Sequence, residues 1–302
     1  MSIDLISEVS VVIPTIGRDT LYRSVQSALE QTVTPREIII CADTLDELHY
    51  PQNPIVTVLR VGPRAGGNAA RSAGVRAASG EYVALLDDDD YWDEDHLSAI
   101  QDVLQEKTVG SSWVASCRVV EPSGNVYPSR LYKNGEDVFG YLFTMKMSPR
   151  SKGALMTPTL VFPKRLMLEV PWRPQQRFHQ DLTWFLDLLR THPDLKIVQV
   201  AQPNVILGDP PGSVSKSIKI DASVQWAREE LLRFPSPTSK RAFADFLLAR
   251  YPGRNATRNG TGSQLRELLQ EALRDGRPSL GAFVYFAVAS LRFTPQRRTN
   301  QK

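Results

Sequence analysis

The feature that most constrains the fold is a run of four aspartates, Asp87 to Asp90, directly after the apolar segment Glu81–Leu86. A short aliphatic and β-branched run of this kind predicts a buried strand. The carboxylates therefore fall where a buried strand reaches the surface, and open α/β sheets bind ligands at that edge. Adjacent carboxylates repel each other by roughly 1 kcal/mol per close pair in water. A divalent cation and a phosphorylated ligand would relieve this repulsion.

The alternative interpretation of the acidic run is the start of a helix. Asp93 to Asp95 would suit the first turn of a helix, where negative charge is favourable. Asp87 and Asp89 are separated from that turn by Tyr91 and Trp92. The spacing therefore favours a metal site at Asp87 and Asp89.

Strands and helices are expected to alternate through the first third of the chain. We predict strands at 9–14, 37–41, 55–61 and 81–86, and helices at 20–31, 67–78 and 93–106. This alternation predicts right-handed crossovers and a mainly parallel sheet. The strand ends carry Pro14, Thr15, Asp43, residues 64–67 and the four aspartates, which should converge on one edge of the sheet.

The remainder of the chain changes character twice. Between 111 and 215 we predict strands at 113–120, 159–162 and 196–200, and a helix at 181–189. From 216 onward the pattern is helical, at about 222–234, 239–250, 264–275 and 280–291, with Ser263 and Ser279 as N-caps.

Composition excludes several classes of protein. The net charge of +3 over 302 residues is too small to indicate nucleic-acid binding. Cys41 and Cys117 lie in apolar runs, so we expect buried thiols and neither a disulfide framework nor a zinc site. The first residues show no secretory pattern, and the apolar run 282–291 is too short to span a bilayer. We therefore expect a cytoplasmic protein.

Three ordered blocks carry a resemblance to a known family, at residues 11–15 (VVIPT), 67–74 (GNAARSAG) and 80–92 (GEYVALLDDDDYW). The chain resembles the family 2 nucleotide-sugar glycosyltransferases of the GT-A fold, strongly over residues 9–107 and more weakly to about 215. The resemblance implies an α/β GT-A fold with a Rossmann-like, mainly parallel sheet and helices on both faces. It also implies a nucleotide-sugar-binding half at 1–110, an acceptor-binding half of the same domain at 111–215, and a helical C-terminal extension at 216–302.

The resemblance assigns a donor pocket to the first blocks. It implies that Pro14 and Thr15 line the nucleobase and ribose site, that Asp43 accepts a hydrogen bond from a pyrimidine N–H, and that Arg71 faces the base or the diphosphate. Without the motif, Asp43 could equally be a surface turn residue and Arg71 an exposed helix arginine.

The same resemblance divides the aspartate run by role. It implies that Asp87 contacts the ribose, that Asp88 belongs to the same donor-binding set, and that Asp89 binds Mg²⁺ or Mn²⁺ bridging the diphosphate. Hard divalent cations commonly use one or two carboxylates together with substrate phosphate. Such a cation would neutralise the charge that develops on the departing nucleoside diphosphate.

A second acidic segment, Phe178–Leu186, resembles the family's Glu/Asp-Asp-x-x-Trp motif. The resemblance implies that Asp181 is the general base that takes the proton from the acceptor hydroxyl. The alternative for Asp181 is an ordinary N-terminal helix residue. His179 competes for the base role, although we expect it to be only a half-exposed neighbour.

Two segments depart from the family pattern. Residues 41–45 hold one acid and no glycine, which leaves the contact with the nucleobase open. Residues 209–215 lack the histidine that often precedes a Gly-Ser segment. Ser213 and Ser215 could therefore contact phosphate or only cap the following segment.

The function indicated by these motifs is a metal-dependent inverting glycosyltransferase. It would use a nucleoside-diphosphate sugar, with a UDP-sugar favoured, and a glycan, lipid-linked or small-molecule acceptor. The alternatives are a non-catalytic nucleotide-sugar-binding protein and a nucleotidyltransferase. Nucleotidyltransferases usually open with a glycine-rich basic loop, whereas residues 14–18 contain one glycine.

The last predicted helix, 280–291, is apolar on nearly all faces and precedes Arg292, Arg297, Arg298 and Lys302. It could be a terminal helix packed on the body of the protein with a solvated basic tail. It could also make peripheral contact with the inner face of a membrane, although no tryptophan and tyrosine belt flanks it.

Overall fold

The computed structural model describes residues 8–104, 112–145, 153–209 and 219–291. Contacts divide the chain into two compact units. The first comprises Met1–Asn134 and Ala154–Ser213, and the second comprises Gly135–Gly153 and Val214–Lys302. The chain therefore passes between the units three times.

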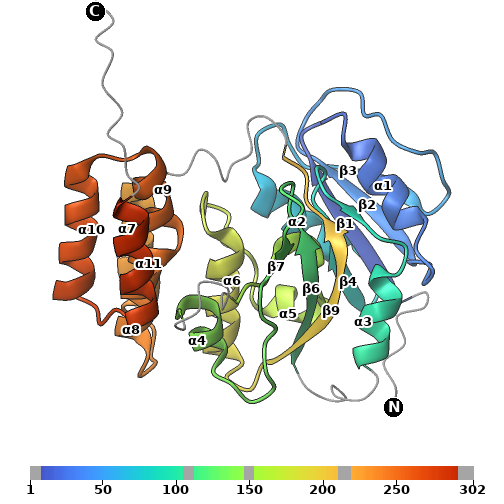
Figure 1. The fold of residues 1–302 in the computed structure, drawn as a ribbon. Coiled ribbons are helices and arrows are strands. Elements are labelled where there is room, and N and C mark those ends of the chain that lie inside the picture. The colour runs from blue at the N-terminus through green and yellow to red at the C-terminus, as the bar shows by residue number, and fades with distance from the viewer. Residues whose placement is uncertain (1–7, 105–111, 146–152, 210–218, 292–302) are drawn as a thin grey trace, which may run out of the picture. The chain divides into compact units, whose positions relative to one another are not determined.

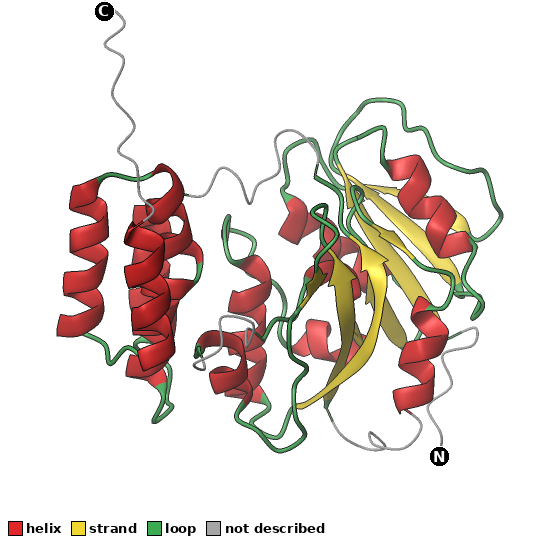
Figure 2. Cartoon of the chain, viewed as in Figure 1, coloured by secondary structure: helices red, strands yellow, loops and turns green. Residues whose placement is uncertain are grey.

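The first unit is built on one twisted sheet, with strands in the order β3-β2-β1-β4-β8-β6-β9-β5 and β7 beside β6 in the described part of the chain (Figure 2). The strands are β1 (Val9–Thr15), β2 (Glu37–Ala42), β3 (Val56–Arg60), β4 (Tyr82–Leu85), β5 (Tyr91–Trp92), β6 (Trp113–Val120), β7 (Val126–Tyr127), β8 (Val161–Pro163) and β9 (Lys196–Ile206). Strands β3, β2, β1 and β4 are mutually parallel, whereas β8 is antiparallel to β4 and β6. The predicted GT-A architecture, a mostly parallel sheet with helices on both faces, is confirmed.

Helices cover both faces of this sheet (Figure 1). They are α1 (Leu21–Leu29), α2 (Gly67–Ala77), α3 (His96–Leu104), α5 (Lys164–Glu169) and α6 (Gln180–Thr191), with a 3₁₀ turn at Thr157–Thr159. Because side chains alternate along a strand, Val11 and Ile13 of β1 join the core formed with α1 and α3. Val12 faces α2 instead, and a Cβ atom added to Gly74 would lie 2.5 Å from Val12 Cγ1.

Parallel pairing brings the ends of β1, β2 and β4 to one edge. Asp43 donates its backbone N–H to the carbonyl of Thr15 (2.8 Å), and Leu86 donates to Val12 (3.2 Å). The polar residues that follow these strands are therefore adjacent although they are far apart in sequence.

Some predicted elements shift. Helix α3 begins at His96, so Asp93 to Asp95 precede it rather than form its first turn, contrary to our expectation. Thr159 ends the 3₁₀ turn instead of starting a strand. Strand β9 continues to Ile206, beyond the predicted end at 200, because its second half pairs with both β6 and β5.

The second unit is helical. It contains α4 (Val138–Phe143), α7 (Ile220–Trp226) continued by a π-helical segment (Ala227–Leu231), α8 (Ser239–Ala249), α9 (Tyr251–Asn259), α10 (Gly262–Arg274) and α11 (Leu280–Leu291). Ser279 caps α11 as predicted, accepting a hydrogen bond from Ala282 N–H (3.1 Å). Thr261, not Ser263, caps α10 through a capping box with Gln264.

Buried Asp245 joins three parts of this unit. Its carboxylate accepts hydrogen bonds from the backbone N–H groups of Met145 (2.7 Å) and Ser279 (2.8 Å). Phe139 of α4 also stacks on Phe234, with ring centroids 4.5 Å apart. The segment that carries α4 is therefore part of the helical unit.

Within the described ranges, no helix combines the length and the apolar character needed to cross a membrane.

Candidate active site

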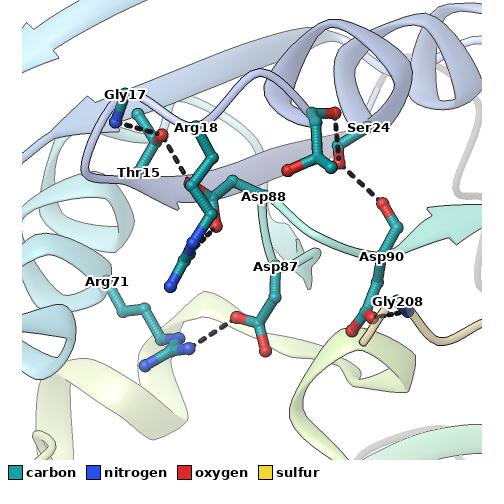
Figure 3. Close-up of polar contacts among 10 residues, drawn as sticks. Thr15, Gly17, Arg18, Ser24, Arg71, Asp87, Asp88, Asp90 and Gly208 are labelled. Atoms are coloured by element: carbon teal, nitrogen blue, oxygen red, sulfur yellow. Dashed lines mark hydrogen bonds and ion pairs between the residues drawn. The ribbon is translucent and has the colours of Figure 1, made fainter. Parts of the chain in front are cut away.

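The four aspartates form the connection between β4 and β5, both of which belong to the sheet. Asp90 closes this connection. Its Oδ1 accepts the N–H of Gly208 (2.8 Å), just after β9, and its carbonyl accepts the hydroxyl of Ser24 (2.6 Å) (Figure 3). Burial, together with the charges of Asp87 and Asp89, raises the pKa of Asp90 to about 8. Asp90 is thus an anchor of the acidic loop.

Asp88 holds the loop that follows β1. It is 2% exposed, accepts a hydrogen bond from Thr15 Oγ1 (2.6 Å), and forms an ion pair with Arg18 (Figure 3). Burial raises the pKa of Asp88 despite these partners. The Thr15 hydroxyl oxygen also accepts the N–H of Gly17 (2.9 Å). Direct contact of Asp88 with a donor stays a prediction.

Asp87 is bound by Arg71 of α2, whose Nη2 lies 2.5 Å from Asp87 Oδ1 (Figure 3). Nη1 of Arg71 donates to the side-chain oxygen of Gln180 at the start of α6 (3.3 Å). The guanidinium carbon lies 5.1 Å from the centroid of the Trp172 ring, and its Nε is buried without a hydrogen-bond partner in the described chain. Arg71 therefore links the strand-end acids to α6.

Asp181 is the second residue of α6, adjacent to this arginine bridge. Its Oδ1 accepts the N–H of Leu182 (2.8 Å). Burial raises the pKa of Asp181, the Leu182 hydrogen bond and the charge of Arg71 oppose that rise, and the charge of Asp87 adds to it. The structure thus brings together Arg71, Asp87 and Asp181, which were predicted from separate motifs.

His179 is buried at the N-cap of α6 in the left-handed region (φ 54°), and burial lowers its pKa to about 4. The expectation that it is half-exposed was wrong, because the turn that starts α6 directs it into the protein. Since burial disfavours its charged form, His179 is a poorer proton carrier than Asp181 near neutral pH.

Asp43 organises the loop between β3 and α2. Its Oδ1 accepts the N–H of Ala65 (2.6 Å) and its Oδ2 accepts that of Gly66 (2.8 Å). A Cβ atom at Gly62 would lie 1.7 Å from Asp43 Oδ1, so a larger residue there would have to displace this carboxylate. Pro14 and Thr15 lie at the neighbouring end of β1. The contacts of these residues with a nucleobase stay predictions.

Unlike Asp87 and Asp88, Asp89 has no salt-bridge partner among the described residues, and unlike Asp90 its carboxylate does not anchor the segment after β9. Burial, then the charge of Asp87, raises its pKa to about 6. The described chain also contains no group of three or more His, Cys, Asp or Glu residues placed to hold a metal ion. The acids fit a cation that takes some of its ligands from a bound phosphate, rather than a preformed protein cage.

Sequence reasoning missed Arg18, Gln180 and Gly208 as contributors to the site. Arg18 and Gln180 lie inside the segments 14–18 and 178–186 that the sequence analysis singled out, so proximity to Thr15 and Asp181 was an available signal. Gly208 gave no local signal, although a Cβ there would lie 2.0 Å from the carbonyl oxygen of Asp89. The predicted phosphate contacts Ser213 and Ser215 lie outside the described residues.

The fold and this edge define the class: a GT-A α/β domain with acids and an arginine gathered where parallel strands end. Residues 10–157 match the sequence model of Glycosyl transferase family 2. This half of the chain belongs to that family.

Curated relatives and solved structures agree with this assignment. The chain is 37% identical over 90 residues to the Escherichia coli UDP-Glc:alpha-D-GlcNAc-diphosphoundecaprenol beta-1,3-glucosyltransferase WfaP, covering 28% of this chain and 36% of that protein. The structure of S. aureus TarS in complex with UDP-GlcNAc is similar with a TM-score of 0.55 at 14% identity, covering 93% of this chain and 90% of that one. The mannosyltransferase PcManGT from Pyrobaculum calidifontis, in complex with GDP-Man and Mn²⁺, has a TM-score of 0.54 at 15% identity, covering 94% and 87%.

The two solved structures share the fold with this chain. The matched segments span less than half the length of the first curated relatives.

Proposed function

We propose that this protein is a metal-dependent inverting glycosyltransferase that moves a sugar from a nucleoside diphosphate to an acceptor hydroxyl. The observation that carries the proposal is the Arg71 bridge. It joins Asp87, at the end of β4, to the N-terminus of α6, which holds Asp181. An acid suited to a nucleotide donor and an acid suited to proton transfer thus belong to one site.

The donor is a UDP-sugar. WfaP is named for a UDP-glucose donor, and TarS was solved with UDP-GlcNAc. In this chain, Pro14, Thr15 and Asp43 face the nucleoside, and Arg71 faces the diphosphate. The guanidinium of Arg71 is the kind of group that pairs with phosphate oxygens.

The acceptor is a hydroxyl on a glycan, and the name of WfaP favours a glycan carried on a lipid diphosphate. This assignment names a substrate class for the same site and adds no residue to it.

Asp89 would hold the divalent cation, Mg²⁺ or Mn²⁺, with Asp87 nearby. Its carboxylate has no salt bridge in the described chain, and oxygen is the ligand such cations prefer. When bound, the cation would neutralise the negative charge of the leaving diphosphate. Arg71 adds positive charge on the same side.

Asp181 acts as the general base. Its raised pKa makes it a better proton acceptor than an ordinary aspartate. As the acceptor oxygen bonds to the anomeric carbon, the bond from that carbon to the diphosphate oxygen breaks and the hydroxyl proton passes to Asp181. A single displacement of this kind inverts the anomeric configuration.

The test is Asp181→Asn, which keeps the shape of the side chain but cannot accept the proton. Turnover should fall by about 10²–10⁴, the range of general-base catalysis, while UDP affinity stays near that of the parent. Asp194→Asn, the same change at an exposed position just after α6, should leave turnover unchanged.

Two further readouts distinguish a base from a structural residue. Since the base must be ionised and its pKa is raised, parental turnover should fall with decreasing pH above the usual aspartate range, and Asp181→Asn should lack this limb. Product NMR should show an inverted anomeric centre. Near-parental turnover in Asp181→Asn, or retained configuration, would refute the mechanism.

A further inference from the structure

The outward side of α11 is a continuous apolar face. Its exposed positions recur every three or four residues, which places them on one side of a helix. They are Leu280, Phe283, Val284, Ala287, Val288 and Leu291. All six are apolar, and Leu291 is 86% exposed.

The opposite side of α11 is fixed to its own unit. Gly281, Ala282 and Phe286 are buried, and α11 packs on α8 and α9. The cap residue Ser279 donates its hydroxyl to the carbonyl of Met145 (2.8 Å) and its N–H to buried Asp245 (2.8 Å). The helix is therefore held in place by one side while presenting the apolar face to solvent.

Positive charge is concentrated in the sequence on both sides of α11. The last 27 residues, 276–302, contain Arg277, Arg292, Arg297, Arg298 and Lys302 and no acidic residue. Their contribution of +5 exceeds the chain's net charge of +3, so residues 1–275 carry −2. In the sequence, this excess of positive charge flanks the apolar helix and does not extend over the rest of the chain.

We propose that this apolar face of α11 docks on an anionic lipid surface. Aliphatic and aromatic side chains would enter the interface between headgroups and acyl chains, and the neighbouring cations would pair with lipid phosphates. A helix of 12 residues is about 18 Å long, whereas the hydrocarbon core is about 30 Å thick. The helix would therefore lie along the surface and not cross it.

Charge distinguishes lipid from a second copy of this chain as the occupant. Two copies meeting through this face would bring together two helices that are each flanked in sequence only by cations, which is unfavourable. An anionic lipid surface complements both the apolar face and its charges. This inference goes beyond the proposed transfer reaction and does not depend on it.

The experiment is co-sedimentation of the full chain with phosphatidylcholine vesicles, with and without phosphatidylglycerol. The parent should bind the anionic vesicles, and added salt should weaken binding. Phe283→Ser combined with Val288→Ser should lower the partition coefficient about tenfold or more, because two apolar side chains no longer enter the interface. Leu168→Ser, at a 51% exposed leucine of α5, is the matched control and should bind like the parent.

A second variant tests, without the serine substitutions, whether the α11 face itself enters the lipid. Val288→Cys can carry a polarity-sensitive fluorophore, because Cys41 and Cys117 are buried. Anionic vesicles should shift its emission to the blue. An unshifted emission, absence of parental binding, or equal binding by the Phe283→Ser/Val288→Ser variant would overturn the proposal. A dimer would overturn it too: light scattering would show the parent as a dimer with or without lipid, and the Phe283→Ser/Val288→Ser variant as a monomer.

UDP binding without vesicles provides a separate readout. The serine variant should bind UDP like the parent. If the serine variant loses vesicle binding but still binds UDP, the effect lies in the α11 face. If the parent fails to bind UDP, the proposed transferase activity is refuted and the docking proposal is untouched.

Discussion

Arg71 is the residue at which the donor edge and α6 meet, so its replacement should affect ligand binding directly. Arg71→Ala is expected to weaken binding of UDP with Mn²⁺ by about 1–3 kcal/mol, the loss of a hydrogen bond that involves a charge. Asp43→Ala should act in the same direction. Arg76→Ala, in the last turn of the same helix, is the control. Calorimetric titrations that show parental affinity in both Arg71→Ala and Asp43→Ala would mean that the pocket is misplaced.

Asp89 should carry the metal dependence. In Asp89→Asn, the gain in UDP affinity that Mn²⁺ gives to the parent should disappear, because an amide is a weaker and uncharged ligand. Binding should then be insensitive to chelation by EDTA, and the melting temperature of the free protein should stay near that of the parent. Asp93→Asn, just past the acidic loop, should keep the Mn²⁺ effect. A full Mn²⁺ effect in Asp89→Asn would remove this residue from the metal site.

At the residue scale, the sequence located the acids but not their partners. Four identical side chains in a row have the same local signal, yet Asp87 pairs with Arg71, Asp88 with Thr15 and Arg18, and Asp90 with Gly208. The partners of Asp88 and Asp90 lie 70 to 118 positions away. Only the folded chain makes those pairs, so the division of roles within the run could not be predicted locally.

Helix α2 approaches the sheet so closely that one position has no room for a side chain. A Cβ atom at Gly74 would lie 2.5 Å from both Cys41 Sγ and Val12 Cγ1. Gly74→Ala should therefore destabilise the protein by about 1–3 kcal/mol through overpacking, even though alanine favours a helix by about 1 kcal/mol. Gly262→Ala, in α10, meets nothing within 4 Å and should be neutral or slightly stabilising. Chemical denaturation measures both, and equal stability of Gly74→Ala and the parent would contradict this packing.

Elements with a strong periodic pattern were predictable. The strand at 113–120 has the predicted bounds, and β1, β2 and α2 agree within a residue or two. The bounds of β8 and of the second half of β9 were not predictable. Tertiary pairing makes β8 shorter than its local pattern suggests and makes β9 longer. The end of β9 is a strand because Val205 and Ile206 have partners on both sides, in β6 and in β5.

At the scale of the whole molecule, the segment 135–153 belongs with the C-terminal helices. A chain that ends at residue 213 would retain α4 without the helices that bury Val138, Phe139 and Leu142. We expect this chain to aggregate. The same chain with a Gly/Ser linker of equal length in place of 135–153 should remain monomeric and bind UDP with Mn²⁺. Size-exclusion chromatography and calorimetry compare the two, and a monomeric, UDP-binding chain that retains 135–153 would contradict the assignment.

Sequence patterns placed one boundary near residue 215 and divided the chain into consecutive parts. They could not reveal that 135–153 joins the helical part, because its partners follow much later. The division into two halves of one GT-A domain and a helical extension stays a prediction, and this pair of chains addresses where the extension begins.

The membership of α4 in the C-terminal unit has a consequence for biosynthesis. Met145 and Asp245, which bond in the finished unit, are 100 positions apart. At about 5–20 residues per second, the ribosome needs roughly 5–20 s to make the intervening chain. During that interval, Val138, Phe139 and Leu142 leave the exit tunnel without their partners. The nascent chain therefore carries an apolar segment that chaperones can bind until its last third emerges.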